Sequence, residues 1–170
     1  MNGSARPGLA QLPGLFHVGW VVRDCAAAQE ELSARLGAGP FRSAGEVRFG
    51  DVLMHGKPTS FTLRIVFGAV GGVLVELLEP LDDRSPHAAF LASHGEGLHH
   101  LAFIVADFDE QLAAVRGPSG TELLVDGTGP GKPWQWVYVD ASTTHGTVIE
   151  LWDRTPAAEE YSAGLLELLR

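Results

Sequence analysis

Two segments that lie far apart in the chain share one pattern of apolar and polar positions. Residues 15–24 read LFHVGWVVRD and residues 98–107 read LHHLAFIVAD. Each is an apolar run typical of a buried strand that ends at an aspartate, and an Ala-, Glu- and Gln-rich stretch with helical spacing follows it. The alignment matches His17 with His100 and Asp24 with Asp107. The pattern therefore indicates an internal repeat that begins with a strand and a helix.

The repeat continues further along the chain, because GVLVELLE at 72–79 aligns with GTVIELWD at 146–153 and matches Glu76 with Glu150. Each copy then consists of a strand, a helix and three more strands, a βαβββ unit. The expected strands are 15–22, 40–48, 60–67 and 73–79 in the first copy and 98–105, 121–125, 134–139 and 147–152 in the second. The first copy carries extra residues, which we expect in a loop at 46–58, EVRFGDVLMHGKP.

The chain divides into five segments on this pattern. Residues 1–14 are rich in Gly, Pro and small side chains and contain no apolar segment of a secretory signal, so we expect a flexible N-terminal tail. The two βαβββ modules cover 15–80 and 98–153. Between them, 81–97 is a connector with a short helix around Pro86, since proline is favoured in a first helical turn. Residues 154–170 are expected to form a C-terminal helix whose leucines pack on the body or on a second subunit.

The repeat singles out four residues that could meet at a metal ion: His17, Glu76, His100 and Glu150. A carboxylate inside an apolar strand is costly unless it is paired or coordinated, and here it recurs at matching positions. Two neutral imidazoles and two carboxylates would neutralise a divalent cation such as Co, Ni, Mn, Fe, Zn or Mg. The alternative is two buried His–Glu ion pairs without metal. His99 is expected to face away, because neighbouring side chains of a strand point to opposite faces.

Composition narrows the range of functions. The formal net charge is −9 and there is no basic run, which argues against a nucleic-acid partner. The longest apolar runs fall well short of the ~20 residues that span a bilayer, so no membrane partner is expected. A single cysteine, Cys25, excludes an internal disulfide framework and suits the reducing cytoplasm.

These features fall within a wider resemblance. From Leu15 to Trp152 the chain resembles the vicinal oxygen chelate superfamily, which includes glyoxalase I, methylmalonyl-CoA epimerase, extradiol dioxygenases and bleomycin-resistance proteins. It is most similar to methylmalonyl-CoA epimerases, in HVGWVV, in VELLEPLDDRSPHAAFLASHGEGLHHLAF and in GTVIEL. The resemblance implies an α+β fold in which the two βαβββ modules form an open, curled mixed β-sheet cavity with helices outside. The family's metal-ligand positions fall on His17, Glu76, His100 and Glu150.

Alternation along the strands predicts the wall of this cavity. In SFTLRIVF at 60–67, the apolar positions are expected to meet the helix and the polar ones to face the cavity. Counting back equally from Glu150 brings three aromatic residues opposite them. The predicted substrate-binding residues are Ser60, Thr62, Arg64, Trp134, Trp136 and Tyr138. Such a wall suits a flat apolar or aromatic ligand with an anionic or carbonyl end. The alternative is that the aromatic residues are ordinary core and Arg64 lies on the surface.

The expected function is that of a metal-dependent isomerase, epimerase or lyase. Its partner would be a small molecule with a carbonyl or vicinal oxygens, the metal would polarise the carbonyl, and Glu150 or Glu76 would move a proton at the adjacent carbon. Epimerases of the family have a further carboxylate where this chain reads KPTSF without an acid. Two alternatives stay open: a non-catalytic binder of a drug or antibiotic, and an Fe(II) extradiol-type dioxygenase. We expect a homodimer.

Overall fold

The computed structural model describes residues 12–116, 123–140 and 146–170. Most of the expected N-terminal tail and the start of the expected strand at 121–125 lie outside these residues. The elements of the first module are β1 (His17–Val21), α1 (Cys25–Leu36), β2 (Phe41–Met54), β3 (Lys57–Val70) and β4 (Val73–Pro80), followed by α2 (Pro86–His94). The remaining elements are β5 (Gly97–Val105), α3 (Phe108–Arg116), β6 (Leu123–Asp126), β7 (Trp136–Val139), β8 (Val148–Asp153), α4 (Pro156–Leu166) and a 3₁₀ turn (Glu167–Leu169).

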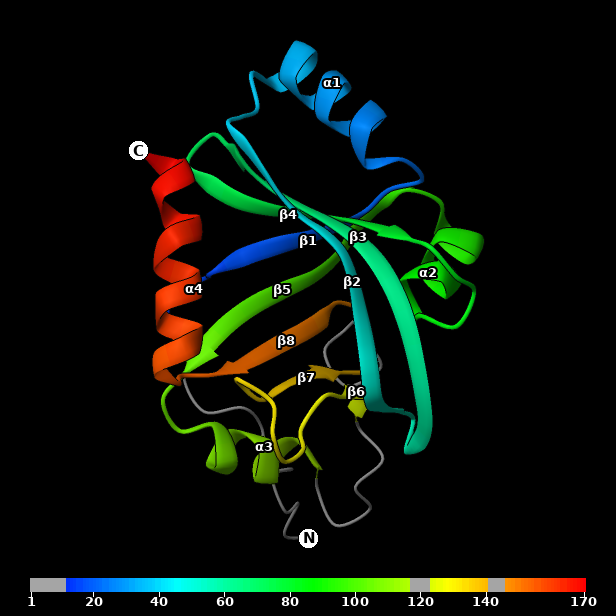
Figure 1. The fold of residues 1–170 in the computed structure, drawn as a ribbon, viewed down its shortest axis with the longest axis vertical. Coiled ribbons are helices and arrows are strands. Elements are labelled where there is room, and N and C mark those ends of the chain that lie inside the picture. Colours follow the sequence, from blue (N-terminus) through cyan, green and yellow to red (C-terminus); the bar gives the residue numbers. More distant parts are fainter. Residues whose placement is uncertain (1–11, 117–122, 141–145) are drawn as a thin grey trace, which may run out of the picture.

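The strands form one mixed, curled sheet that closes into a barrel in the order β1-β4-β3-β2-β6-β7-β8-β5. Within each module the first and last strands run parallel, β1 beside β4 and β5 beside β8. The modules meet at two antiparallel seams, a long one between β1 and β5 and a short one between β2 and β6. The helices lie outside the sheet (Figure 1). The expected α+β fold with two βαβββ units is confirmed, and the short second seam closes the sheet that we expected to be open.

Local sequence explains where the helices begin. Asp24 precedes α1 and its side chain accepts hydrogen bonds from the backbone N–H groups of Ala26 and Ala27. Ser85 does the same for α2 and Thr155 for α4, each with a proline at the next position. Such caps satisfy amide groups that have no partner inside the helix, which stabilises the helix by about 1 kcal/mol. Among the described residues, no helix is both long and apolar enough to span a membrane.

The loop expected at 46–58 is instead a long hairpin of β2 and β3. Residues 47, 49, 52 and 54 are apolar and at least partly buried, with a register shift between Phe49 and Val52 that keeps them on one side of the sheet. The turn at His55 and Gly56 has positive φ at both positions (46° and 74°), as a tight hairpin turn requires. The prediction was wrong because the bulge interrupts the period-two pattern by which a strand is recognised.

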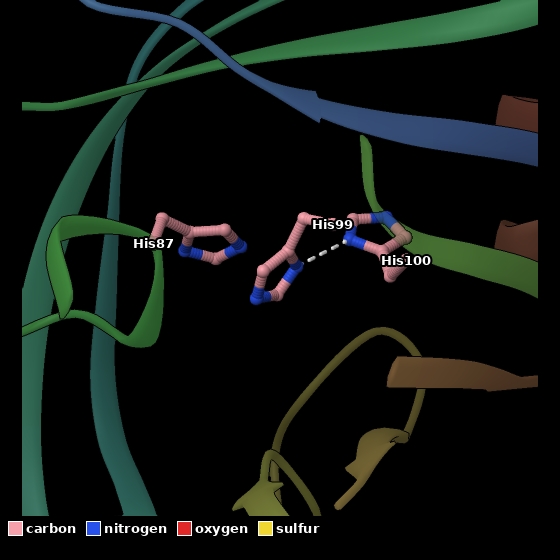
Figure 2. A group of neighbouring side chains, drawn as sticks. All are labelled: His87, His99 and His100. Atoms are coloured by element: carbon pink, nitrogen blue, oxygen red, sulfur yellow. Dashed lines mark hydrogen bonds between the residues drawn. The ribbon is translucent and has the colours of Figure 1, made fainter. Parts of the chain in front are cut away.

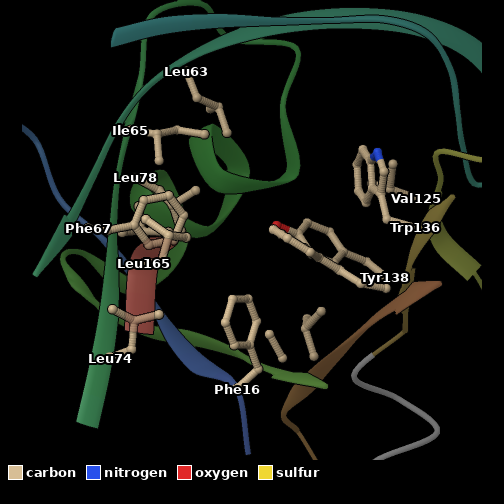
Figure 3. Packing of buried hydrophobic residues seen from close by; sticks show 14 of the residues in the cluster. Phe16, Leu63, Ile65, Phe67, Leu74, Leu78, Val125, Trp136, Tyr138 and Leu165 are labelled. Atoms are coloured by element: carbon tan, nitrogen blue, oxygen red, sulfur yellow. The ribbon is translucent and has the colours of Figure 1, made fainter. Parts of the chain in front are cut away.

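The core has an inner and an outer part. The inner cluster lies within the barrel, and Figure 3 shows Leu63, Ile65 and Phe67 of β3 directed into it together with Tyr138 of β7. Two smaller clusters lie between the sheet and the helices that cover it, one beneath α1 and one beneath α3. Burying a large apolar side chain contributes about 1.5–3 kcal/mol. The inner cluster draws on all eight strands and on α4, so the whole barrel contributes to the surroundings of the candidate site.

Candidate metal centre

The four residues predicted from the repeat come together inside the barrel. His17 lies on β1, Glu76 on β4, His100 on β5 and Glu150 on β8. These four strands are neighbours around the seam between β1 and β5, so each module supplies one histidine and one glutamate. Both histidines are fully buried and both glutamates are 5% exposed. Strand pairing therefore brings the matched residues of the two copies together.

The ligand atoms are spaced as a metal site requires. His17 Nε2 lies 3.3 Å from Glu76 Oε2 and 3.2 Å from Glu150 Oε2. His100 Nε2 lies 3.3 and 3.4 Å from the same two oxygens, and the two Nε2 atoms are 3.3 Å apart. Atoms that each lie about 2.0–2.1 Å from one ion are about 3.3 Å apart when they bond it at tetrahedral angles. Glu150 Oε2 is buried without a hydrogen bond of good geometry. The four residues thus fit a divalent cation.

Electrostatics also prepare the site for a cation. Burial by itself would lower the pKa of His17, but the adjacent carboxylates of Glu150 and Glu76 outweigh it and raise the pKa to about 9. Burial would likewise raise the pKa of Glu76, yet hydrogen bonds from His100 and His17 hold it well below its usual range. Without metal, a proton shared with His17 compensates the buried carboxylates. A divalent ion would take the place of that proton.

We expected His99 to face away from the site, but in the structure it does not. In the ladder between β1 and β5, Gly19 pairs with His100 and Trp20 with Leu98, so His99 is an extra residue with no partner on β1. At such a bulge the alternation of side chains is interrupted. His99 is consequently buried on the same side as His100, and the two Nδ1 atoms are 3.1 Å apart (Figure 2).

A third histidine joins this pair from α2. His87 is fully buried, its ring centre is 4.7 Å from that of His99, and its Nε2 lies 3.2 Å from the hydroxyl of Tyr138. Burial lowers the pKa of His87 to about 3 and also lowers that of His99. Both are therefore neutral at pH 7. Sequence reasoning missed His87, although it lies in the segment that resembles epimerases.

A cavity of about 610 Å³ opens from the glutamates toward solvent. Trp134, Trp136 and Tyr138 line it, as expected from the sequence, and Trp134 stacks on Trp152 with ring centres 5.5 Å apart. Three cationic residues also line the cavity: Arg42, Arg48 and Lys132. The C-terminal helix α4 also contributes, through Tyr161 and Leu165, although we expected its leucines to pack away from any site.

The predicted role of Ser60, Thr62 and Arg64 in the cavity wall is wrong, because these residues lie on the opposite face of β3. Phe67 stands directly opposite Glu76 and so faces the interior. Its counterpart opposite Glu150 is Tyr138.

Phe67 and Glu76 are nine positions apart, whereas Tyr138 and Glu150 are twelve apart. Counting the same number of residues back from each glutamate therefore misaligns the two strands by an odd number of positions, which assigns the wrong face of β3 to the cavity. Arg64 instead forms ion pairs with Glu46 at 2.8 Å and Glu79 at 2.6 Å. Ile65 and Phe67 line the cavity.

Gly19 is a further residue that the sequence analysis passed over. A Cβ atom on Gly19 would lie only 2.0 Å from Cε1 of His100, because the imidazole ring lies across the glycine. A glycine inside an apolar strand often marks such a close approach. This signal was present in HVGWVV and could have linked Gly19 to the site.

Comparison with known proteins gives a consistent picture. Residues 16–138 match the Glyoxalase/Bleomycin resistance protein/Dioxygenase superfamily. Methylmalonyl-CoA epimerase from Mycobacterium tuberculosis has a TM-score of 0.60 and 25% sequence identity, over 94% of this chain and 97% of that one. A variant of the Streptomyces coelicolor methylmalonyl-CoA epimerase in complex with 2-nitronate-propionyl-CoA has a TM-score of 0.59 and 24% identity, over 84% of this chain and 98% of that one. Protein YqjC of Bacillus subtilis (strain 168) is 43% identical over 53 residues, which are 31% of this chain and only 38% of YqjC.

Proposed function

Because this chain belongs to the glyoxalase/bleomycin resistance protein/dioxygenase superfamily, we propose that it is a divalent-metal-dependent isomerase or epimerase. It would move a proton at the carbon next to a carbonyl of a small-molecule substrate. The observation that carries the proposal is the convergence of four buried residues at the base of a cavity, where the two histidine nitrogens lie 3.3 Å apart and each is 3.2–3.4 Å from both glutamate oxygens. A bound divalent ion supplies Lewis-acid polarisation of the carbonyl oxygen, which acidifies the adjacent carbon. We propose that His17, Glu76, His100 and Glu150 hold this ion.

The proton acceptor in this proposal is Glu150 or Glu76. Among the described residues that line the cavity, these two are the only carboxylates, and no histidine lines it. In each, Oε2 faces the histidine nitrogens, which leaves the second carboxylate oxygen to receive a proton.

The cavity wall supports a substrate with an apolar or aromatic body and an anionic group. Trp134, Trp136 and Tyr138 offer flat faces, and Arg42 and Lys132 offer positive charge in a protein whose net charge is −9. Local cationic groups can attract an anion in spite of the overall charge. One solved relative holds a CoA ester analogue, so acyl-CoA esters form one class to test, beside aromatic keto acids.

Deuterium exchange tests the proposal. The metal-loaded protein is incubated in D₂O with candidate carbonyl compounds, and NMR follows exchange at the adjacent carbon. We expect exchange that requires metal and is lost in Glu150→Gln. Glu79→Gln is the matched control, since Glu79 lies on β4 but pairs with Arg64 outside the cavity. A protein that binds no divalent ion at all would contradict the proposal.

Two observations favour a second candidate, a non-catalytic binder. The cavity is large and aromatic, and the region 57–61 contains no carboxylate of the kind found in epimerases. A binder would retain a ligand tightly and would show no exchange in any Glu variant or in the parent protein. An Fe(II) dioxygenase is less favoured, because its site uses two histidines and one carboxylate and leaves positions open for substrate and oxygen.

A further inference from the structure

The contact between His99 and His100 is not used by the proposed reaction. His100 Nε2 is one of the four ligand atoms, whereas its Nδ1 points away from them to Nδ1 of His99 at 3.1 Å (Figure 2). Two nitrogens at this distance share one hydrogen, because a hydrogen bond needs one donor and one acceptor. The question is which of the two rings carries it.

The proton count of the rings gives the answer. A neutral imidazole carries one hydrogen, and a nitrogen that binds a metal must offer its lone pair. If Nε2 of His100 binds the ion, its hydrogen is on Nδ1, which then donates. Nδ1 of His99 must accept, and the hydrogen of His99 is then on its Nε2.

We propose that His99 is a positioning residue that accepts the Nδ1–H of His100 and so fixes the tautomer and ring orientation that present Nε2 to the metal. The inference rests on the proposed metal site. The His99 ring is itself held in place, with the rings of His87 and Phe90 at 4.7 and 5.2 Å. Partners of this kind typically account for a 10–100-fold share of metal affinity.

The bulge in β5 is what makes the contact geometrically available. In a regular strand the two side chains would lie on opposite faces, and His99 could not reach His100. Because of the extra residue, the side chain of His99 points toward His100, and His99 has no partner in the β1–β5 ladder. His17 has no corresponding partner, since its buried Nδ1 makes no hydrogen bond with any described residue.

Two variants separate positioning from packing. His99→Phe keeps a ring of similar size but removes the acceptor. His99→Asn places an amide oxygen where Nδ1 was and so restores a hydrogen-bond acceptor. His94→Phe is the control, because His94 is exposed on α2. Zn²⁺ affinity is measured by competition with a chelator, and the melting temperature in EDTA verifies that each variant folds.

We expect Zn²⁺ affinity to fall about 10–100-fold in His99→Phe, to recover most of that loss in His99→Asn and to be unchanged in His94→Phe. In ¹⁵N NMR of the Zn²⁺-loaded protein, the Nδ1-bound proton of His100 should be visible in the parent and in His99→Asn, and lost by exchange in His99→Phe. Equal affinity and an unchanged Nδ1 proton in a folded His99→Phe would overturn the proposal. So would a second equivalent of Zn²⁺ that is lost in His99→Phe, because His99 would then be a ligand.

The outcome also distinguishes the two proposals. Failure of the parent protein to bind Zn²⁺ or any other divalent ion would remove the proposed function. Normal binding by all three variants would remove only the role of His99.

Discussion

Replacing Gly19 with alanine should disable the candidate metal centre through a single methyl group. Gly19 stands opposite His100 in the β1–β5 ladder. An added Cβ would lie 2.0 Å from Cε1 of His100 and 2.3 Å from both ring nitrogens. Since carbon atoms in contact are about 3.5–4.0 Å apart, the ring or the strand must move by more than about 1 Å.

The surroundings leave the ring little room for that movement. His100 is fully buried, with the ring of Tyr138 at 5.0 Å and that of His17 at 5.4 Å. Overpacking a core by a methyl group destabilises a protein by about 1–3 kcal/mol. A shift of about 1 Å also takes Nε2 out of bonding distance of the ion, so metal affinity should fall by at least about 100-fold, more than loss of an outer partner usually causes.

Urea unfolding in EDTA measures the first effect and chelator competition measures the second. Gly97→Ala is the matched control, because Gly97 begins β5 and an added Cβ would meet nothing within 4 Å. The reasoning is refuted if Gly19→Ala binds metal as tightly as Gly97→Ala.

Further predictions concern pH, Cys25, Arg64 and assembly. In EDTA, the stabilising charge of His17, whose pKa rises from 6.5 to about 9, is fully present below pH 6.5. The free energy of unfolding should therefore decrease as the pH rises from 6.5 through 9. Because the pKa of Glu76 is lowered, the free energy of unfolding should also decrease as the pH falls below about 4.5. A free energy of unfolding that does not change with pH would contradict both expectations. Burial, followed by the charge of Glu79, raises the pKa of Cys25 to about 12, so iodoacetamide should label it only in urea. Arg64→Ala should leave KM for an anionic substrate unchanged, since Arg64 pairs outside the cavity; a raised KM would reopen its role. Light scattering should give twice the mass of one chain if the expected homodimer forms.

The four candidate ligands could be predicted from sequence because the repeat and the strand pairing obey the same register. A histidine and a glutamate at matching positions of two copies must occupy equivalent places once the copies pack together. The cavity wall was harder to predict. Its prediction depended on equal hairpin lengths, and the additional residues between Tyr138 and Glu150 reversed the face assigned to β3. Loop length is free to vary where nothing buried depends on it.

The helices at 25–36 and 86–94 were predictable for a local reason. Asp24 precedes the first and Pro86 stands in the first turn of the second, and each acts only on the turn in which it lies. A bulge has no such local signature. The misplaced loop at 46–58 and the misdirected His99 both follow from bulges, at Phe49–Val52 and opposite Gly19. Period-two reasoning fails at these points, because an inserted residue alters the alternation that it assumes.

The seam between β1 and β5 shows where the two copies have diverged. Each candidate ligand histidine stands opposite a small residue on the other strand: His100 opposite Gly19, and His17 opposite Ala102. Since residues 19 and 102 are matched positions of the repeat, symmetry alone would allow alanine at both. Only the first must be glycine, because the His100 ring lies across it, beside the bulged His99. The glycine, the bulge and the Nδ1 contact thus form one asymmetric arrangement around His100, whereas His17 keeps the simpler environment.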